Sequence, residues 1–209
     1  MGRTNRIPLF PLEVVLFPGA PLPLHIFEPR YKLMTKRCLE NHEPFGVVLA
    51  RSEGIAEVGC TADIVEVVKK YEDGRMDILT MGREVIRVVE VCDEKAYLEA
   101  KVEYLEDDSA PDTPDTQQRL QRLFEQCHRF VHHSEPSTAE FAEGYTLAYR
   151  ISSELPLDLE YKQQVLEVRS EAERQRRLLE KLAKWLPQLV HVERVRAKAA
   201  GNGHGLREG

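Results

Sequence analysis

The feature that most constrains the fold is an apolar opening stretch that prolines interrupt. It reads IPLFPLEVVLFPGAPLPLHIFEPRY over residues 7–31 and contains six prolines. Each proline fixes its own φ and pushes the preceding residue toward an extended conformation, so short strands are favoured over a continuous helix. We predict strands at Glu13–Phe17 and Leu22–Ile26, joined by a turn at Pro18–Pro21 into a first hairpin.

The same stretch argues against a membrane span or a secretory leader. Its longest apolar piece without proline is Leu12–Phe17, whereas a transmembrane helix needs about 20 residues. The four cysteines lie far apart and form no CxxC motif. This is typical of reduced thiols rather than of a disulfide scaffold or a zinc ribbon, so we expect a cytoplasmic protein.

Charge restricts the partners that the sequence favours. The net charge is −6, and residues 1–107 contain 14 basic against 19 acidic side chains. Proteins that bind nucleic acid usually present a basic patch or stripe. We therefore expect no nucleic-acid partner.

Shorter apolar runs after the opening predict a small sheet with one early helix. Residues 31–39 have helical spacing, and we expect this helix to end near Asn41. Strands are predicted at 45–50, 61–71, 76–81, 84–91 and 97–104. Asp73-Gly74 supplies the positive φ that a tight hairpin turn needs. Six or so mostly antiparallel strands predict a strongly bent sheet or open barrel, and the helices that follow make the class α+β.

An acidic segment with two prolines, EDDSAPDTPDT at residues 106–116, separates the predicted sheet from the predicted helices. Helices are predicted at 117–132, 139–155, 159–168 and 171–186, with Pro187 interrupting the last. We predict four parts: a β subdomain (1–107), a linker (108–116), a helical subdomain (117–198) and a disordered tail (199–209).

Common catalytic motifs are absent from the sequence, which contains no GxxxxGK[ST], HExxH or GxSxG. Metal-ligand residue types gather at Cys127, His128 and His132, where two histidines four residues apart share a helix face. Because a fourth ligand is not in sight, we expect no metal or other cofactor. A small metal- or Cys-dependent hydrolase stays an alternative.

Two charged segments have ordinary structural interpretations. RSEAERQRR at residues 169–177 mixes both signs at three- and four-residue spacing, which is typical of a solvated helix face with ion pairs. Where the second strand meets the first helix, we expect Glu28 to pair with Arg30 and Phe27 to pack under Tyr31. The alternative is that this corner belongs to a recognition surface.

A known family shows the same motifs in the same order. These are the opening stretch, FGVVLA, EVGCTADIVEVVKKYEDGRMDILTMGREVIRVVEV, YLEAKVEYLED and LPLDLEYKQQVLE. They resemble the N-terminal substrate-binding domain of the Lon protease family over about residues 6–196. The resemblance implies a PUA-like bent antiparallel sheet or pseudo-barrel followed by a C-terminal α-helical bundle.

A full Lon protease continues with a nucleotide-binding AAA+ module and a Ser-Lys protease domain, and the sequence contains neither motif set. The resemblance therefore implies a stand-alone, non-catalytic member that binds unfolded segments or a partner polypeptide in protein quality control. A Lon-type protease is a candidate partner. The alternative is RNA binding, which the PUA-like fold suggests and the acidic β part disfavours.

A domain that recognises unfolded protein has to expose apolar surface of its own. Our candidate polypeptide-binding residues lie in the first hairpin and the corner after it: Leu12, Phe17, Leu24, Phe27, Glu28, Arg30 and Tyr31.

Overall fold

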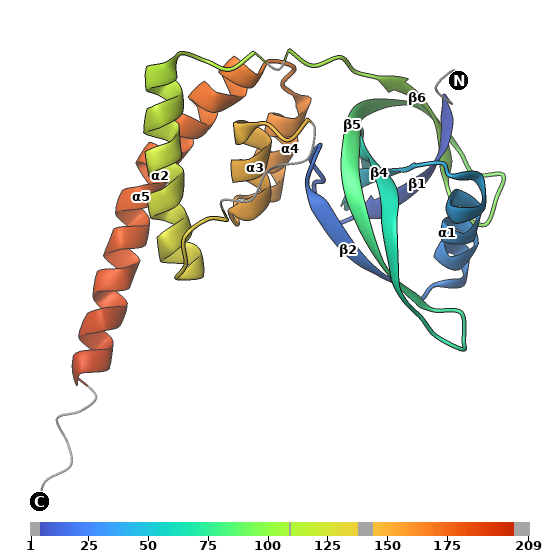
Figure 1. Cartoon of the computed structure of the whole chain (residues 1–209), viewed down its shortest axis with the longest axis horizontal. Coiled ribbons are helices and arrows are strands. Elements are labelled where there is room, and N and C mark those ends of the chain that lie inside the picture. The colour runs from blue at the N-terminus through green and yellow to red at the C-terminus, as the bar shows by residue number, and fades with distance from the viewer. Residues whose placement is uncertain (1–4, 109, 138–143, 203–209) are drawn as a thin grey trace, which may run out of the picture. The chain divides into compact units, whose positions relative to one another are not determined.

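The computed structural model describes residues 5–108, 110–137 and 144–202 (Figure 1). The strands within these residues are β1 (Arg6–Leu12), β2 (Pro21–Ile26), β3 (Phe45–Arg51), β4 (Gly54–Lys70), β5 (Met76–Cys92) and β6 (Glu99–Tyr104). The helices are α1 (Pro29–Asn41), α2 (Pro114–His132), α3 (Leu147–Glu154), α4 (Leu159–Glu167) and α5 (Glu171–Asn202). The predicted α+β class is confirmed.

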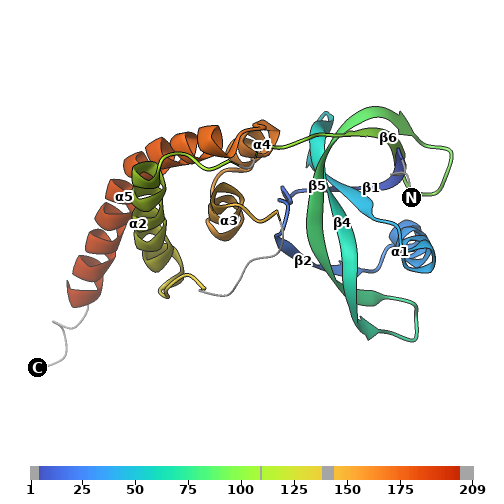
Figure 2. The ribbon, with the colours of Figure 1, turned by 45° about the horizontal axis from the view of Figure 1, so that its top comes forward.

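The six strands form one sheet in the order β2-β5-β4-β3-β1-β6, and β5 also pairs with β6. The long strand β5 makes this closure possible, because Met76–Met81 pair with β2 while Ile86–Cys92 pair with β6. The sheet consequently curls around an apolar interior (Figure 2). All pairs are antiparallel except that of β1 with β3.

The opening stretch differs from its prediction. The first strand is Arg6–Leu12, Glu13–Phe17 is not a strand, and β2 pairs with β5 rather than with β1. The predicted first hairpin is therefore wrong. Pro21 and Pro23 fit because they lie in β2, an edge strand of the sheet, where a missing N–H breaks no ladder bond.

The segment between β1 and β2 is a buried loop that crosses close to β5. Gly19 N–H donates to the Gly82 carbonyl (2.8 Å), and Gly82 N–H donates to the Ala20 carbonyl (2.9 Å). A Cβ at Gly82 would lie 2.1 Å from the Phe17 carbonyl oxygen. Glycine at position 82 is thus required by the close approach of this loop.

Several other predicted elements are confirmed, with changed bounds. Helix α1 ends at Asn41, β3 covers the predicted strand at 45–50, and Gly74 turns the β4–β5 hairpin with φ of 80°. The two strands predicted at 76–81 and 84–91 form the single strand β5. Sequence reasoning divided them because Gly82 and Arg83 look like a break, whereas Gly82 lies within the ladder with β4.

Contacts divide the chain into two compact units. Unit 1 contains residues 1–109 and 140–170, and unit 2 contains residues 110–139 and 171–209. Helices α3 and α4 belong to unit 1: the Tyr149 ring lies 5.6 Å from that of Phe17, and Gln163 Nε2 donates to the Val58 carbonyl (2.9 Å). These units differ from the predicted subdomains, because α3 and α4 pack on the sheet.

In unit 2, α2 packs along α5 through fully buried side chains: Leu120, Phe124, Cys127, Leu178 and Leu182. Helix α5 continues through Pro187 to Asn202, so the predicted helix end is wrong. The proline frees the carbonyl of Ala183, which is exposed and can bond to water.

Two predictions, one of a helix and one of a disordered tail, reach beyond the described residues. Of the predicted helix at 139–155, residues 147–154 form α3 and residues 144–146 are not helical, while residues 139–143 lie outside the described part. The predicted disordered tail at 199–209 begins inside α5, and residues 203–209 lie outside the described part.

A buried carboxylate, Glu99, joins three elements of unit 1. It lies 3.0 Å from Arg6 Nη2 and 3.0 Å from Lys95 Nζ, and it accepts a hydrogen bond from Arg37 of α1. Burial raises the pKa of Glu99, but the hydrogen bonds from Lys95 and Arg37 outweigh burial and hold this pKa below its usual range.

We expect Glu99 to make the stability of unit 1 sensitive to acid. A carboxyl whose pKa is lower in the folded state stabilises above its unfolded pKa of about 4.3, and that contribution is lost as the pH falls through the folded pKa. Between pH 7 and about pH 3, the wild type should therefore lose on the order of 1 kcal/mol more free energy of unfolding than Glu99→Gln. Urea unfolding followed by circular dichroism measures this, with the exposed Glu103→Gln of the same strand as control. Parallel pH curves for wild type and Glu99→Gln would contradict it.

Candidate functional site

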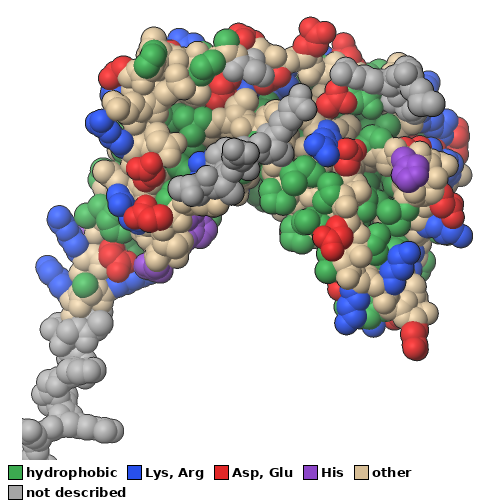
Figure 3. All heavy atoms as spheres, viewed as in Figure 1, with side chains coloured by type: hydrophobic (Ala, Val, Ile, Leu, Met, Phe, Trp, Pro, Cys, Tyr) green, Lys and Arg blue, Asp and Glu red, His purple; other side chains and the backbone are tan. Residues whose placement is uncertain are grey.

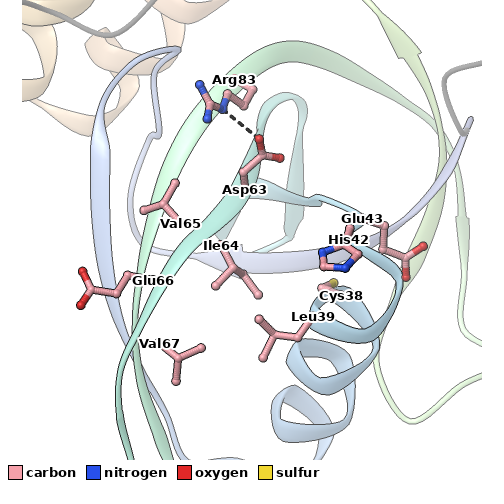
Figure 4. Close-up of a pocket in the computed structure, with 10 residues that line it drawn as sticks. All are labelled: Cys38, Leu39, His42, Glu43, Asp63, Ile64, Val65, Glu66, Val67 and Arg83. Carbon is pink, nitrogen blue, oxygen red and sulfur yellow. Dashed lines mark hydrogen bonds and ion pairs between the residues drawn. The ribbon is translucent and has the colours of Figure 1, made fainter. Parts of the chain in front are cut away.

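A groove separates α1 from the second half of β4. It consists of two hollows, of about 480 Å³ and about 710 Å³, that share Leu39 in their lining. The smaller hollow lies between the C-terminal end of α1 and residues 63–67 of β4 (Figure 4). The larger one lies nearer the β4–β5 turn and includes Tyr71 and Met76. We call the two hollows together the α1–β4 groove.

Apolar side chains from both elements face one another across the groove. Ile64 and Val67 of β4 point toward Leu39 of α1, whereas Val65 and Glu66 lie on the other side of β4 (Figure 4). The groove arises here because α1 turns its buried face, with Met34 and Cys38 among others, into the sheet interior. Leu39 remains half-buried at the rim.

Polar groups close the α1 C-terminal end of the groove. Arg83 Nε donates to an Asp63 carboxylate oxygen at 2.9 Å. Cys38 lies at the buried side, where burial raises the pKa of its thiol to about 12. A thiol that stays protonated is a weak nucleophile, so this hollow offers no reactive cysteine.

Basic side chains line the end of the groove near the β4–β5 turn. They are Lys32, Lys36, Lys70 and Arg75, with Glu40 as the carboxylate among the lining residues. Lys36 lies 3.8 Å from Glu40, and Arg75 pairs with Asp73 at 2.7 Å. In the space-filling view, hydrophobic side chains gather between β4 and α1, and charged side chains surround the turn (Figure 3).

Two apolar side chains near the β4–β5 turn end of the groove are exposed to solvent. Leu33 of α1 is 54% exposed and lines the groove, and Phe27 is 58% exposed. The Phe27 ring stacks on His25 at 5.9 Å, and His25 lies 5.9 Å from Tyr71, which lines the groove. An aromatic cluster therefore continues the apolar surface of the groove to Phe27.

Asp77 fixes this cluster. It accepts a hydrogen bond from the Tyr71 hydroxyl at 2.7 Å and pairs with His25 Nδ1 at 2.5 Å. The hydrogen bond with His25, followed by that from Tyr71, lowers the pKa of Asp77. The contacts of Asp77 with His25 and Tyr71 therefore fix the position of the exposed Phe27 ring, which stacks on His25.

The seven predicted site residues fall into three groups. Phe17 and Tyr31 are buried, Leu12, Leu24 and Glu28 are half-buried, and Phe27 and Arg30 are exposed. A role in polypeptide binding stays a prediction for the accessible ones. Phe17 and Tyr31 belong to the core, so they can meet a polypeptide only if that core repacks.

The corner after β2 is partly as predicted. Arg30 Nε donates to Glu28 at 2.9 Å, which confirms the expected pair. The expected packing of Phe27 under Tyr31 is wrong, because the Tyr31 ring lies against Phe10 at 4.1 Å. Phe27 instead points to solvent beside His25.

Sequence reasoning missed the groove residues Leu33, Leu39, Ile64 and Val67. One signal was available in α1, whose buried face uses positions 31, 34, 35 and 38. Leu33 lies off that face, so it is a surplus apolar residue on the helix.

The Cys127 cluster has structural contacts. His128 Nδ1 lies 2.9 Å from the Ser134 carbonyl oxygen, the His128 and His132 rings are 4.4 Å apart, and burial raises the pKa of Cys127 to about 11. Among the described residues, no group of three or more His, Cys, Asp or Glu side chains is placed to hold a metal ion. Nor does any helix in the described ranges have the length and apolar character needed to cross a membrane.

Comparison with known proteins gives the same family for the sequence and the fold. The family model of the ATP-dependent protease La (LON) substrate-binding domain matches residues 6–184. A Lon N-terminal domain protein from Xanthomonas campestris superposes with a TM-score of 0.66 at 24% identity, covering 87% of this chain and 99% of that one. The N-terminal domain of a Mycobacterium avium complex Lon protease gives a TM-score of 0.60 at 14% identity, covering 85% and 98%.

Full-length relatives are similar over one part only. A Lon protease from Anaeromyxobacter dehalogenans is 29% identical over 177 residues, which are 77% of this chain and 21% of that protein. A Lon protease from Parabacteroides distasonis is 31% identical over 120 residues, 53% of this chain and 14% of that protein. The chain thus spans about a fifth or less of these two relatives. It belongs to the family of the LON substrate-binding domain.

Proposed function

We propose that this chain is a non-catalytic module that recognises polypeptide, binding apolar segments of unfolded or partner proteins in protein quality control. The main observation behind this proposal is the apolar surface of unit 1, where Phe27 and Leu33 are exposed beside the α1–β4 groove. Substrate binding is what the family description names. Exposed apolar patches of this kind are typical of interaction sites.

We further propose that the protein acts in the cytoplasm, with a Lon-type protease as a candidate partner. All four cysteines are free thiols, and three of them are buried. Unpaired cysteines are typical of a reducing compartment. The names of the relatives support the choice of partner.

The first test measures binding of an unfolded protein. Reduced, carboxymethylated and fluorescein-labelled α-lactalbumin, titrated with this chain, should give saturable fluorescence anisotropy, whereas the folded protein should not. Phe27→Asp should weaken binding at least about tenfold, because burying one phenyl side chain contributes about 1.5–3 kcal/mol. The exposed ring makes few core contacts, so this variant should keep the wild-type circular dichroism spectrum.

Val89→Asp is the matched control. Val89 is 65% exposed and does not line the groove. Equal weakening by Phe27→Asp and Val89→Asp would contradict recognition at this surface. No binding up to about 100 μM would contradict the proposed function itself. Salt-dependent submicromolar binding of a labelled RNA oligonucleotide in the same assay would favour the RNA alternative.

A further inference from the structure

The half of β4 that borders the groove is an open sheet edge. The pairing of β4 with β3 stops at Ala62, opposite Phe45, the first residue of β3. From Asp63 to Lys70, the ladder pairs of β4 go to β5. Helix α1 precedes β3 and lies beside this half of β4 in both views (Figures 1 and 2). The backbone of residues 63–70 therefore faces the groove on the side away from β5.

We propose that a polypeptide binds in the α1–β4 groove as an added β-strand, antiparallel to residues 63–70 of β4, with acidic residues at its N-terminal end. This inference rests on the proposed function, because it states how a recognised polypeptide is held. An unpaired sheet edge offers N–H and C=O groups to an incoming strand, and a neighbouring groove takes its side chains. Antiparallel pairing is the slightly more stable arrangement.

The apolar lining fits alternate side chains of such a strand. In a strand, every second side chain points to the same face. Ile64 and Val67 on one wall and Leu39 on the other offer these side chains an apolar surface. Backbone pairing supplies affinity that does not depend on sequence, which suits a protein that binds many unfolded segments.

Two bulges select among possible strands. The register with β5 shifts between Ile64 and Glu66 and again between Val67 and Lys69, so Val65 and Val68 are extra residues. Bulges bend an edge and oppose pairing with a long, flat strand. A rigid β4 edge of a second copy fits poorly, whereas a short segment of unfolded chain can follow the bend.

Charge sets the direction of the bound segment. At the end of the groove near the β4–β5 turn, Lys32 Nζ donates to the Asp73 carbonyl at 2.8 Å, and Lys70 has no ion pair with any described residue. Neither lysine pairs with Glu40, the carboxylate among the groove's lining residues, which lies 3.8 Å from Lys36. The Asp73 carboxylate, which interacts with Lys32, is itself paired with Arg75. An antiparallel strand begins at this end, so acidic residues at its N-terminus meet both lysines.

The test uses the peptide Ac-Glu-Glu-Val-Thr-Val-Thr-Val-Gly-Lys-amide with fluorescein on its lysine. At saturation it should slow hydrogen exchange of backbone amides within residues 63–70 at least tenfold and leave α2 unchanged. Two N-methylated forms, one methylated at the threonine amides and one at the valine amides, block opposite edges of the peptide strand. One should lose binding and the other should retain it. An equal effect of both patterns, whether binding is kept or lost, would overturn the added strand.

Charge reversal tests the direction. The double variant Lys32→Glu, Lys70→Glu should bind the acidic peptide about tenfold more weakly and bind a Lys-Lys counterpart more tightly than wild type does. Unchanged affinities would overturn the acidic preference. Binding of unfolded α-lactalbumin without protection of residues 63–70 would overturn the added strand while the proposed function stands. Protection accompanied by dimer formation in sedimentation would show a second copy as the occupant and also overturn the inference.

Discussion

Phe17→Asp is expected to prevent unit 1 from folding. The Phe17 side chain is fully buried, and its ring lies 5.6 Å from that of Tyr149. Removing a buried phenyl group costs about 3–5 kcal/mol, and burying an unpaired carboxylate adds several kcal/mol. Their sum approaches the whole stability of a typical domain, which is about 5–15 kcal/mol. Circular dichroism should show loss of β-structure at neutral pH.

Two variants make this result interpretable. Phe17→Leu keeps an apolar side chain and should lower the free energy of unfolding by roughly 1–3 kcal/mol while the protein stays folded. Phe27→Asp should have nearly wild-type stability, because its ring is exposed. A wild-type unfolding midpoint for Phe17→Asp would show that the loop at residues 13–20 does not pack as described. Loss of polypeptide binding by Phe17→Asp would report unfolding, so Phe27 is the residue that tests recognition.

The error at the opening stretch has a physical cause. Apolar residues at 13–17 have the same local pattern in a strand and in a buried loop. What decides between them is the hydrogen bonding of Gly19 and Ala20 with Gly82, more than 60 residues away. By contrast, the β4–β5 turn depends on Asp73-Gly74 alone, and the sequence predicted it correctly.

The candidate site was predictable only in part for the same reason. The corner at residues 25–31 could be singled out, because a strand, a proline and a helix start follow one another there. The groove could not, because it depends on where β3 begins relative to β4 and on α1 lying beside the half of β4 that β3 does not pair with. The order of motifs nevertheless pointed to the right family, since many positions contribute to such a resemblance.

The prediction of a solvated helix face at residues 169–177 was only partly correct. Glu173 pairs with Arg177 at 2.8 Å and with Arg176 at 3.3 Å on the solvated side, as predicted. Glu171 and Arg174 are buried instead, and Arg174 is 0% exposed. Ion pairs at three-residue spacing look alike in a sequence whether they are solvated or buried, so the neighbouring elements decide.

Glu171→Ala is consequently expected to destabilise unit 2 by about 3–5 kcal/mol, because it removes a carboxylate from a buried guanidinium. Arg174 Nη2 lies 2.9 Å from Glu171, and Gln175 Nε2 also donates to Glu171 at 2.8 Å. Trp185, the single tryptophan, lies in α5 and reports unfolding of this helix by fluorescence in urea. The midpoint should fall far below that of the wild type.

Glu173→Ala is the matched control, since it removes a carboxylate from the same turn whose side chain is 38% exposed, and it should cost at most about 1 kcal/mol. The double variant Glu171→Ala, Arg174→Met should be more stable than Glu171→Ala alone, because it replaces the buried guanidinium that has lost the Glu171 carboxylate by an apolar side chain of similar length. If the double variant is less stable than Glu171→Ala, then Arg174 stabilises unit 2 through its other contacts and the charge left behind is not the cause of the loss. Equal effects of Glu171→Ala and Glu173→Ala would contradict the buried pair, because burial is what separates the two carboxylates in otherwise similar positions on one helix.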